Sequence, residues 1–265
     1  KKDIKTIFDP FIKNNYKMDF FCNPNERQGG LLPPGIEKIG NHNKDLNLLQ
    51  FMQEISLAED HMIFISIPDF HWAMQDWSYT KRGEKAALFE TRQSLDIIFD
   101  HLDKDDFDHI FMFSDHGFKF SAQLKFETAH DFINSDRTNI FMLSRAKGEK
   151  SLSYEHKLCS IQDLSHTVNH LFGLECKYSL FSDGARDYVL IEDHYNISPP
   201  KVNLDLDIWA LINDQGVYVR TLTSAAFISH DRAMQTLVID EYDAILQRET
   251  QFGRYYDEQK KVFAY

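Results

Sequence analysis

The sequence lacks several features that would place it in a class directly. Its 265 residues hold three cysteines and no Cys-x-x-Cys pair, which argues against a disulfide scaffold while leaving room for one bridge. No run of about 18 apolar residues occurs, so we expect no membrane-spanning helix in this chain. A Gly-x-Ser-x-Gly elbow is also missing, which disfavours a serine hydrolase of that type.

Basic charge is scarce as well. The chain has 29 Lys and Arg against 41 Asp and Glu, a formal net charge of −12. This balance argues against nucleic acid and against an anionic membrane surface as partners. An acidic protein that handles an anionic ester must supply positive charge locally, and a metal ion with a few Lys, Arg or His residues would supply it.

The chain begins with neither an initiator methionine nor a signal peptide. We therefore expect Lys1 to be an internal residue of a longer parent protein, whose N-terminal half is missing here. Because a removed export signal is compatible with this start, the sequence leaves the cellular location open.

The residues that are present alternate between short apolar runs and helical patterns. Four runs are typical of strands buried on both faces of a sheet: residues 61–67, 109–113, 139–143 and 187–191. Three segments have helical periodicity: residues 45–57, 84–102 and 161–172. The alternation predicts an α/β domain over residues 1–200, with a mainly parallel sheet between layers of helices.

The pattern changes near residue 200. Ile208–Ile212 and Val217–Leu222 are joined by Asn213-Asp214-Gln215-Gly216, which predicts a β-hairpin. The polar tail from about Asp240 is expected to be helical or irregular. Residues 201–265 are therefore predicted to form a small antiparallel subdomain packed on the first domain.

Polar clusters follow two of the predicted strands. Asp69-Phe70-His71 comes just after the first strand, and Asp115-His116-Gly117 comes directly after the second. The functional crevice of an open α/β sheet lies beyond the carboxyl ends of its strands. An adjacent Asp and His can supply one carboxylate and one imidazole to a divalent cation. The alternative is that Asp115 caps a helix and His116 is an ordinary surface histidine.

Two strings carry a family resemblance. FMFSDHG and FISIPDFHWAM resemble the strand-plus-motif signatures of the alkaline-phosphatase/sulfatase superfamily, although Ala73 stands where that family usually has Pro. The resemblance implies an alkaline-phosphatase-like fold in which Asp115 and His116 ligate one divalent metal ion, either Ca, Mn, Mg or Zn. It also implies that His71 contacts the sulfate or phosphate group or the leaving oxygen. A loop histidine satisfied by backbone is the alternative for His71.

Other positions are carried by the same resemblance. It implies that Lys125 neutralises oxygens of the ester, with Lys119 competing for this role and a solvated surface lysine as the alternative for both. Asp69 is expected to be structural. His166 and His170 have a spacing that can bind zinc, but Val168 and Leu171 favour a packed helix.

No nucleophile of the family is evident. The stretch from Cys22 to Arg27 nearly matches the Cys-x-Pro-x-Arg sequence that sulfatases convert to formylglycine, but its arginine comes one residue too late. The chain is therefore identified as a C-terminal portion that lacks the nucleophile segment and is expected to be inactive alone.

The resemblance implies a function for the parent protein. This is a metal-dependent hydrolase or transferase of sulfate or phosphate esters, acting on a sugar or lipid headgroup. One alternative is a non-catalytic fragment or pseudoenzyme that acts as a binding module. Another is a two-metal phosphodiesterase or phosphomutase, for which Asp69 and His71 would both have to be ligands.

Overall fold

The structure is a computed structural model of the chain, and it describes most of the residues between Thr6 and Thr250. The described residues are 6–22, 39–41, 45–70, 73, 80–117, 140–151, 153–154, 157–174, 176–182, 184, 186–197, 204–221, 225–229 and 239–250.

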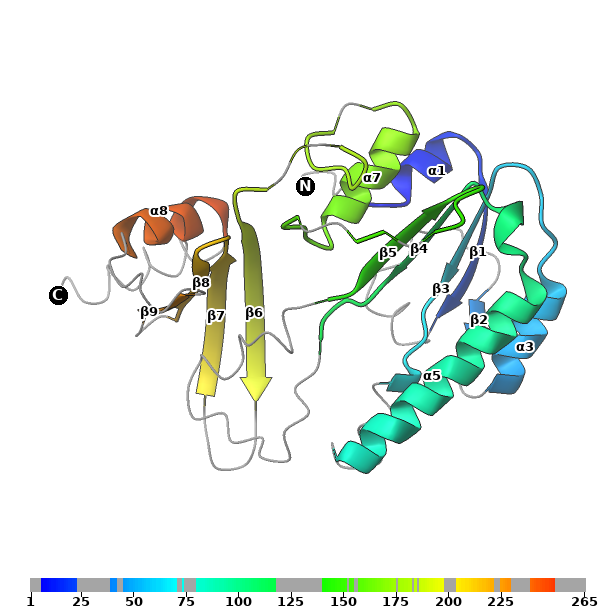
Figure 1. Ribbon diagram of the computed structural model, residues 1–265, viewed down its shortest axis with the longest axis horizontal. Helices are drawn as coiled ribbons and strands as arrows, with labels where there is room; N and C mark the ends of the chain where they lie inside the picture. The colour runs from blue at the N-terminus through cyan, green and yellow to red at the C-terminus, as the bar shows by residue number, and fades with distance from the viewer. Residues whose placement is uncertain are drawn as a thin grey trace.

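Three parallel strands form the first sheet (Figure 1). They are β1 (Lys17–Cys22), β2 (Ile39–Asn41) and β3 (His61–Ile65), in the order β2-β1-β3. β1 pairs with β3 from Lys17 opposite His61 to Phe21 opposite Ile65. Parallel pairing suits strands that are apolar along most of their length, because both faces of such a sheet are covered.

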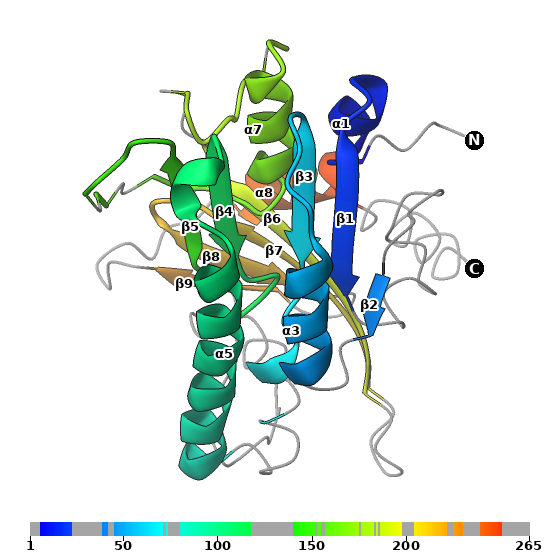
Figure 2. The same ribbon diagram turned by 90° about the vertical axis from the view of Figure 1, so that its right-hand side faces the viewer.

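Helices cover one face of this sheet. α3 (Asp45–Glu54) and α5 (Lys81–His101) pack side by side in front of β1 and β3 in Figure 2. Their buried apolar side chains form one core with Phe21 of β1: Leu48, Phe51 and Met52 of α3 and Ile98 of α5. α5 begins three residues before the expected Glu84, because the Thr80 hydroxyl accepts a hydrogen bond from Gly83 N at 3.2 Å and caps the helix there.

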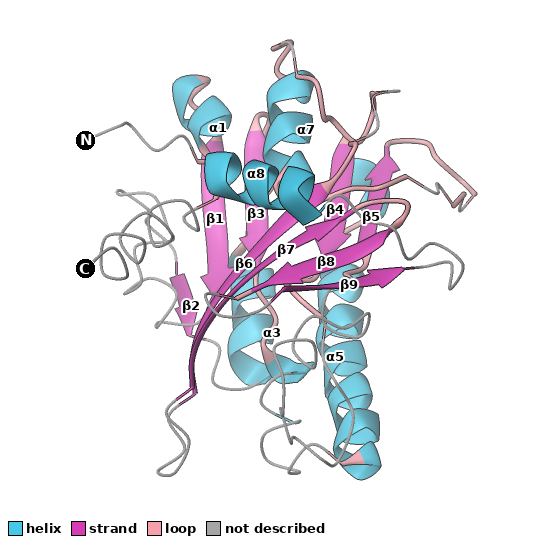
Figure 3. Ribbon diagram, turned by 90° about the vertical axis from the view of Figure 1, so that its left-hand side faces the viewer, coloured by secondary structure: helices cyan, strands magenta, loops and turns pink. Residues whose placement is uncertain are grey.

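A pair of antiparallel strands continues this layer. β4 (His109–Phe113) pairs with β5 (Met142–Ala146), and Figures 2 and 3 show the pair beside β3. β4 has the bounds predicted from its apolar run. β5 begins three residues after the predicted Asn139. It continues into Ser144 and Arg145, and a partly exposed strand of this kind gives no continuous apolar signal.

α7 (Asp163–Leu171) ends as the sequence predicts. Gly173 has φ of +74°, Gly173 N donates to His170 O at 2.9 Å, and Leu174 N donates to Asn169 O at 3.0 Å. These two bonds are the Schellman pattern that closes a helix at a left-handed residue. Phe172 lies edge-on to Phe11, with ring centroids 5.1 Å apart, which places this end of α7 against α1 (Asp9–Lys13).

The C-terminal part is an antiparallel sheet with one helix lying across it (Figure 3). Its strands are β6 (Val189–Ile197), β7 (Leu204–Ile212), β8 (Gly216–Arg220) and β9 (Ala225–Ser229), hydrogen-bonded in that order. α8 (Ile239–Glu249) packs on this sheet through Tyr242 and Leu246, which join Trp209 and Tyr218 in a core of their own. The predicted hairpin is confirmed as β7 and β8.

β6 belongs to this sheet and runs further than the sequence predicts. It pairs with β7 from Val189 opposite Ile212 to Ile197 opposite Leu204, whereas the predicted strand ended at Ile191. The sequence does not predict the second half of the strand, because the polar residues from Glu192 to Asn196 interrupt the apolar run. The C-terminal sheet thus includes residues that lie before the expected boundary at residue 200.

Candidate functional site

The candidate site lies at the carboxyl ends of neighbouring strands. Figures 1 and 2 show β4 beside β3 and running in the same direction, so the residues that follow the two strands come out at one edge of the layer. Asp69 follows β3, and Asp115 and His116 follow β4. Backbone pairing fixes the start of the second segment, because Ser114 N donates to the O atom of Phe141, the residue just before β5, at 3.2 Å.

Asp115 and His116 both reach solvent. The side chain of Asp115 is 82% exposed and that of His116 is 48% exposed. The two lie together, with His116 Nε2 at 3.7 Å from Asp115 Oδ2, while His116 N donates to Asp115 Oδ1 at 2.9 Å. The alternative in which Asp115 caps a helix stays open, because the residues that follow Gly117 lie outside the described ones.

The ring of His116 is oriented by its neighbour. Nδ1 lies 2.8 Å from Gly117 O, and because a carbonyl oxygen only accepts, Nδ1 must carry the proton. In the neutral ring the lone pair is then on Nε2, the atom turned toward Asp115. A backbone carbonyl that fixes the tautomer in this way is the usual support of a metal-ligating histidine.

These two side chains could supply two ligands to a metal ion. A carboxylate oxygen and an imidazole nitrogen fit the donor chemistry of zinc and manganese, and calcium and magnesium favour the oxygen. Within the described ranges, no three His, Cys, Asp or Glu side chains gather as such a group. The described residues therefore offer two ligands at this edge, and a complete site requires others.

The structure does not describe the other residues predicted for the site. His71 and Lys125, like the competing Lys119, lie outside the described residues. Asp69 is buried and accepts a hydrogen bond from the Ser94 hydroxyl of α5, which agrees with the structural role expected for it. This bond ties the segment after β3 to the helix that covers the sheet.

The two histidines with zinc-like spacing pack against aromatic rings, and the cysteines give no sign of a reactive thiol. The ring of His166 lies edge-on to Tyr178 at 5.9 Å, and the ring of His170 lies 6.5 Å from Phe181. Cys22 is buried at the end of β1, and all three cysteines are free thiols. Burial raises the pKa of the Cys159 thiol, and the charge of Asp163 raises it further, so this thiol is a poor nucleophile.

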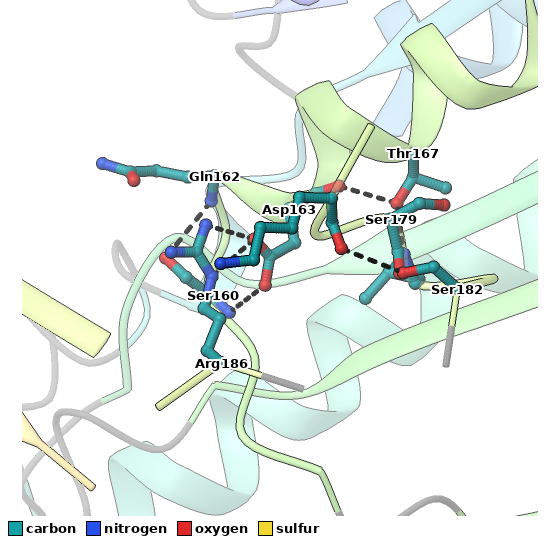
Figure 4. A network of polar contacts seen from close by, with 9 residues as sticks. Ser160, Gln162, Asp163, Thr167, Ser179, Ser182 and Arg186 are labelled. Carbon is teal, nitrogen blue, oxygen red and sulfur yellow. Dashed lines mark hydrogen bonds and ion pairs between the residues drawn. The ribbon is translucent and has the colours of Figure 1, made fainter. Parts of the chain in front are cut away.

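The structure also brings together buried charges that the sequence did not indicate. Asp163 lies at the centre of a polar network around the start of α7 (Figure 4). Its Oδ1 accepts from Arg186, with Nε at 2.7 Å, and its Oδ2 accepts from Ser160 N at 2.8 Å. The Thr167 hydroxyl accepts from Leu180 N at 2.8 Å, which fastens the segment before β6 to the same helix.

A second cluster joins the buried side chains of Asp19 and His61 to the partly exposed Lys17 at the amino ends of β1 and β3. The only local signal for it is Asp19 itself, a carboxylate inside the apolar run MDFFC. A charge in a buried strand requires a partner, although the sequence does not say which residue that is.

Comparison with known proteins adds no assignment. No protein-family model matches the sequence, and none of the curated proteins matches it significantly. Across the described residues, no helix is both long and apolar enough to cross a membrane.

Proposed function

We propose that this chain contributes Asp115 and His116 to the metal site of a hydrolase or transferase that acts on sulfate or phosphate esters. The observation that carries the proposal is the exposed, tautomer-fixed imidazole of His116 beside the carboxylate of Asp115, directly beyond the carboxyl end of β4. The motif resemblance supplies the reaction class, with a sugar or lipid headgroup as the substrate.

The roles of the chain's own residues follow from this arrangement. Asp115 brings a negative charge to a divalent cation, and His116 presents the Nε2 lone pair while the Gly117 carbonyl holds its Nδ1 proton. The cation, when bound, would stabilise charge on the ester oxygens. His71 would orient the ester or protonate the leaving oxygen, and Lys125 would neutralise a non-bridging oxygen.

The remaining ligands and the nucleophile would come from outside this chain, in the parent protein. A single metal ion is favoured over two, because the carboxylate of Asp69 is buried and already accepts a hydrogen bond from Ser94. In this proposal Asp69 holds the loop after β3 in place.

Metal binding provides the test. Calorimetric titration with Mn²⁺, Zn²⁺, Ca²⁺ and Mg²⁺ is made on the parent protein and on this chain, each as wild type, Asp115→Ala and His116→Gln. Both substitutions should weaken binding by at least about tenfold, because each removes a ligand. Asp214→Ala, at an exposed position in the turn between β7 and β8, is the matched control and should bind normally.

Activity is measured on the same proteins with p-nitrophenyl sulfate and p-nitrophenyl phosphate. Turnover by the parent protein that is lost in both variants, and absent from this chain alone, would support a site shared between two parts of the protein. If the parent protein neither binds a divalent metal nor hydrolyses either ester, the proposed function is wrong and the chain is a binding module.

A further inference from the structure

A buried ionisable cluster lies at the edge of the sheet opposite Asp115. The side chains of His61 and Asp19 are 3% and 4% exposed, and His61 Nε2 lies 2.9 Å from Asp19 Oδ2. The Lys17 ammonium lies 3.1 Å from the same oxygen and donates to Ser56 O at 2.6 Å. The cluster therefore connects β1, β3 and the segment that follows α3.

The geometry fixes the tautomer of neutral His61. An ionised carboxylate only accepts, so the proton of the neutral ring is on Nε2 and points at Asp19. Nδ1 is buried and has no hydrogen-bond partner among the described residues. A second proton would enter at Nδ1, where it would meet neither an acceptor nor solvent.

Burial and the charge of Lys17 oppose the addition of a second proton to His61. Burial lowers the pKa of His61 below its ordinary value of 6.5, and the positive charge of Lys17 lowers it further. The hydrogen bond to Asp19 and the negative charge of Asp19 raise the pKa of His61, and they do not offset burial and Lys17.

The residues beside the cluster hold the same ends of the two strands. Asp60 precedes His61 with a left-handed φ of +52°, and its carbonyl accepts from Lys17 N at 2.9 Å. The Tyr16 hydroxyl is hydrogen-bonded to the side chain of Asp60, whose charge, after burial, raises the pKa of that phenol. Asp108, just before β4, also raises the pKa of Tyr16 through its charge. Tyr16, Asp60 and Asp108 are thus further ionisable groups at this edge, and Lys17 is the cation whose charge acts on the ring.

We propose that Lys17, Asp19 and His61 form an acid-sensitive latch, which closes the amino ends of β1 and β3 at neutral pH and opens when His61 is protonated. The imidazolium is better solvated in an opened or unfolded chain than in the closed cluster. Acidification therefore favours states in which this edge of the sheet is separated.

The direction of the pH effect follows from the linkage between protonation and folding. Because the folded pKa of His61 is below the unfolded one, the closed state binds fewer protons than the open state. Above pH 6.5 the ring is neutral in both states and no penalty exists. As the pH falls below 6.5, the equilibrium constant for opening rises by at most about tenfold per pH unit, until the folded pKa is passed.

The test uses hydrogen–deuterium exchange of the full chain between pH 7.5 and 5.0, with rates corrected for intrinsic chemistry. Peptides covering β1 and β3 should lose protection below pH 6.5 in the wild type and keep it in His61→Gln. The glutamine amide can still donate to Asp19 but does not titrate in this range. His109→Gln removes an exposed histidine at the start of β4 and should behave as the wild type.

An NMR titration of the His61 imidazole gives a second test, which begins with the wild-type protein. Its midpoint should lie below 6.5 and should rise in Lys17→Met, because a neighbouring positive charge is removed. A midpoint at or above 6.5, or the same loss of protection in His61→Gln as in the wild type, would overturn the proposal.

Discussion

Asp163 makes more hydrogen bonds and ion-pair contacts than any local sequence pattern suggests. Its carboxylate accepts from Arg186 and from Ser160 N, and its backbone carbonyl accepts from the Thr167 hydroxyl at 2.6 Å. The Asp163 and Arg186 side chains are 4% and 15% exposed. Removing one partner of a buried pair leaves the other charged and unpaired, which costs more than the pair contributes when intact.

We therefore expect Asp163→Asn to lower the free energy of unfolding by about 3–5 kcal/mol, because Arg186 loses its anion in a site that excludes water. Urea denaturation followed by circular dichroism measures this change. Asp96→Asn is the matched control, since Asp96 pairs with Arg92 on the surface of α5 and is 65% exposed. It should cost at most about 0.5 kcal/mol, and equal losses in both variants would contradict the role given to Asp163.

At the scale of the element, the C-terminal end of α7 depends on one backbone conformation. Gly173 has a positive φ, and a Cβ built on it meets no atom within 4 Å. A substitution there changes conformational strain and leaves packing untouched. Gly173→Ala should therefore destabilise the protein by about 1–2 kcal/mol, the cost of an L-residue in the left-handed region.

An asparagine substitution at Gly173 separates the effect of backbone strain from the effect of side-chain crowding. Gly173→Asn should lose less stability than Gly173→Ala, although its side chain is larger, because asparagine tolerates the left-handed conformation. Thermal unfolding of the two variants beside the wild type makes the comparison. A larger loss for asparagine would mean that side-chain volume, and not φ, decides the outcome.

Elements with a strong local signal could be predicted from the sequence, and those defined by distant partners could not. β4 was predicted with its bounds because HIFMF is apolar after its first residue, and α7 was predicted because its apolar residues recur at helical spacing. The second half of β6 is polar and exists through its pairing with β7. No local pattern connects Asp163 to Arg186 or Asp19 to His61, which are 23 and 42 residues apart.

The candidate site also has a part that a local motif indicates and a part that depends on tertiary structure. Asp115 and His116 are adjacent in the sequence, so a motif is enough to propose them, and the structure adds the tautomer that leaves the Nε2 lone pair available in the neutral ring. Their metal, the roles of His71 and Lys125, and the ester stay predictions, because each depends on atoms that come together only through tertiary structure.

At the scale of the whole molecule, the described residues contain two hydrophobic cores with no residue in common. One lies between the β1–β3 sheet and helices α3 and α5, and the other lies between the C-terminal sheet and α8. Leu48 is fully buried in the first and Leu246 in the second. Separate cores can open separately, each with its own free energy.

This arrangement predicts that Leu48→Ala and Leu246→Ala act on different parts of the chain. Each should cost about 2–5 kcal/mol, since each removes fully buried methyl groups and leaves a cavity. In native-state hydrogen exchange, Leu246→Ala should reduce the protection of β7, β8 and α8 while β1 and β3 keep theirs. Leu48→Ala should do the reverse. If either variant accelerates exchange uniformly through both cores, the chain unfolds as one cooperative unit, and protonation of the His61 latch would then loosen the C-terminal sheet as well.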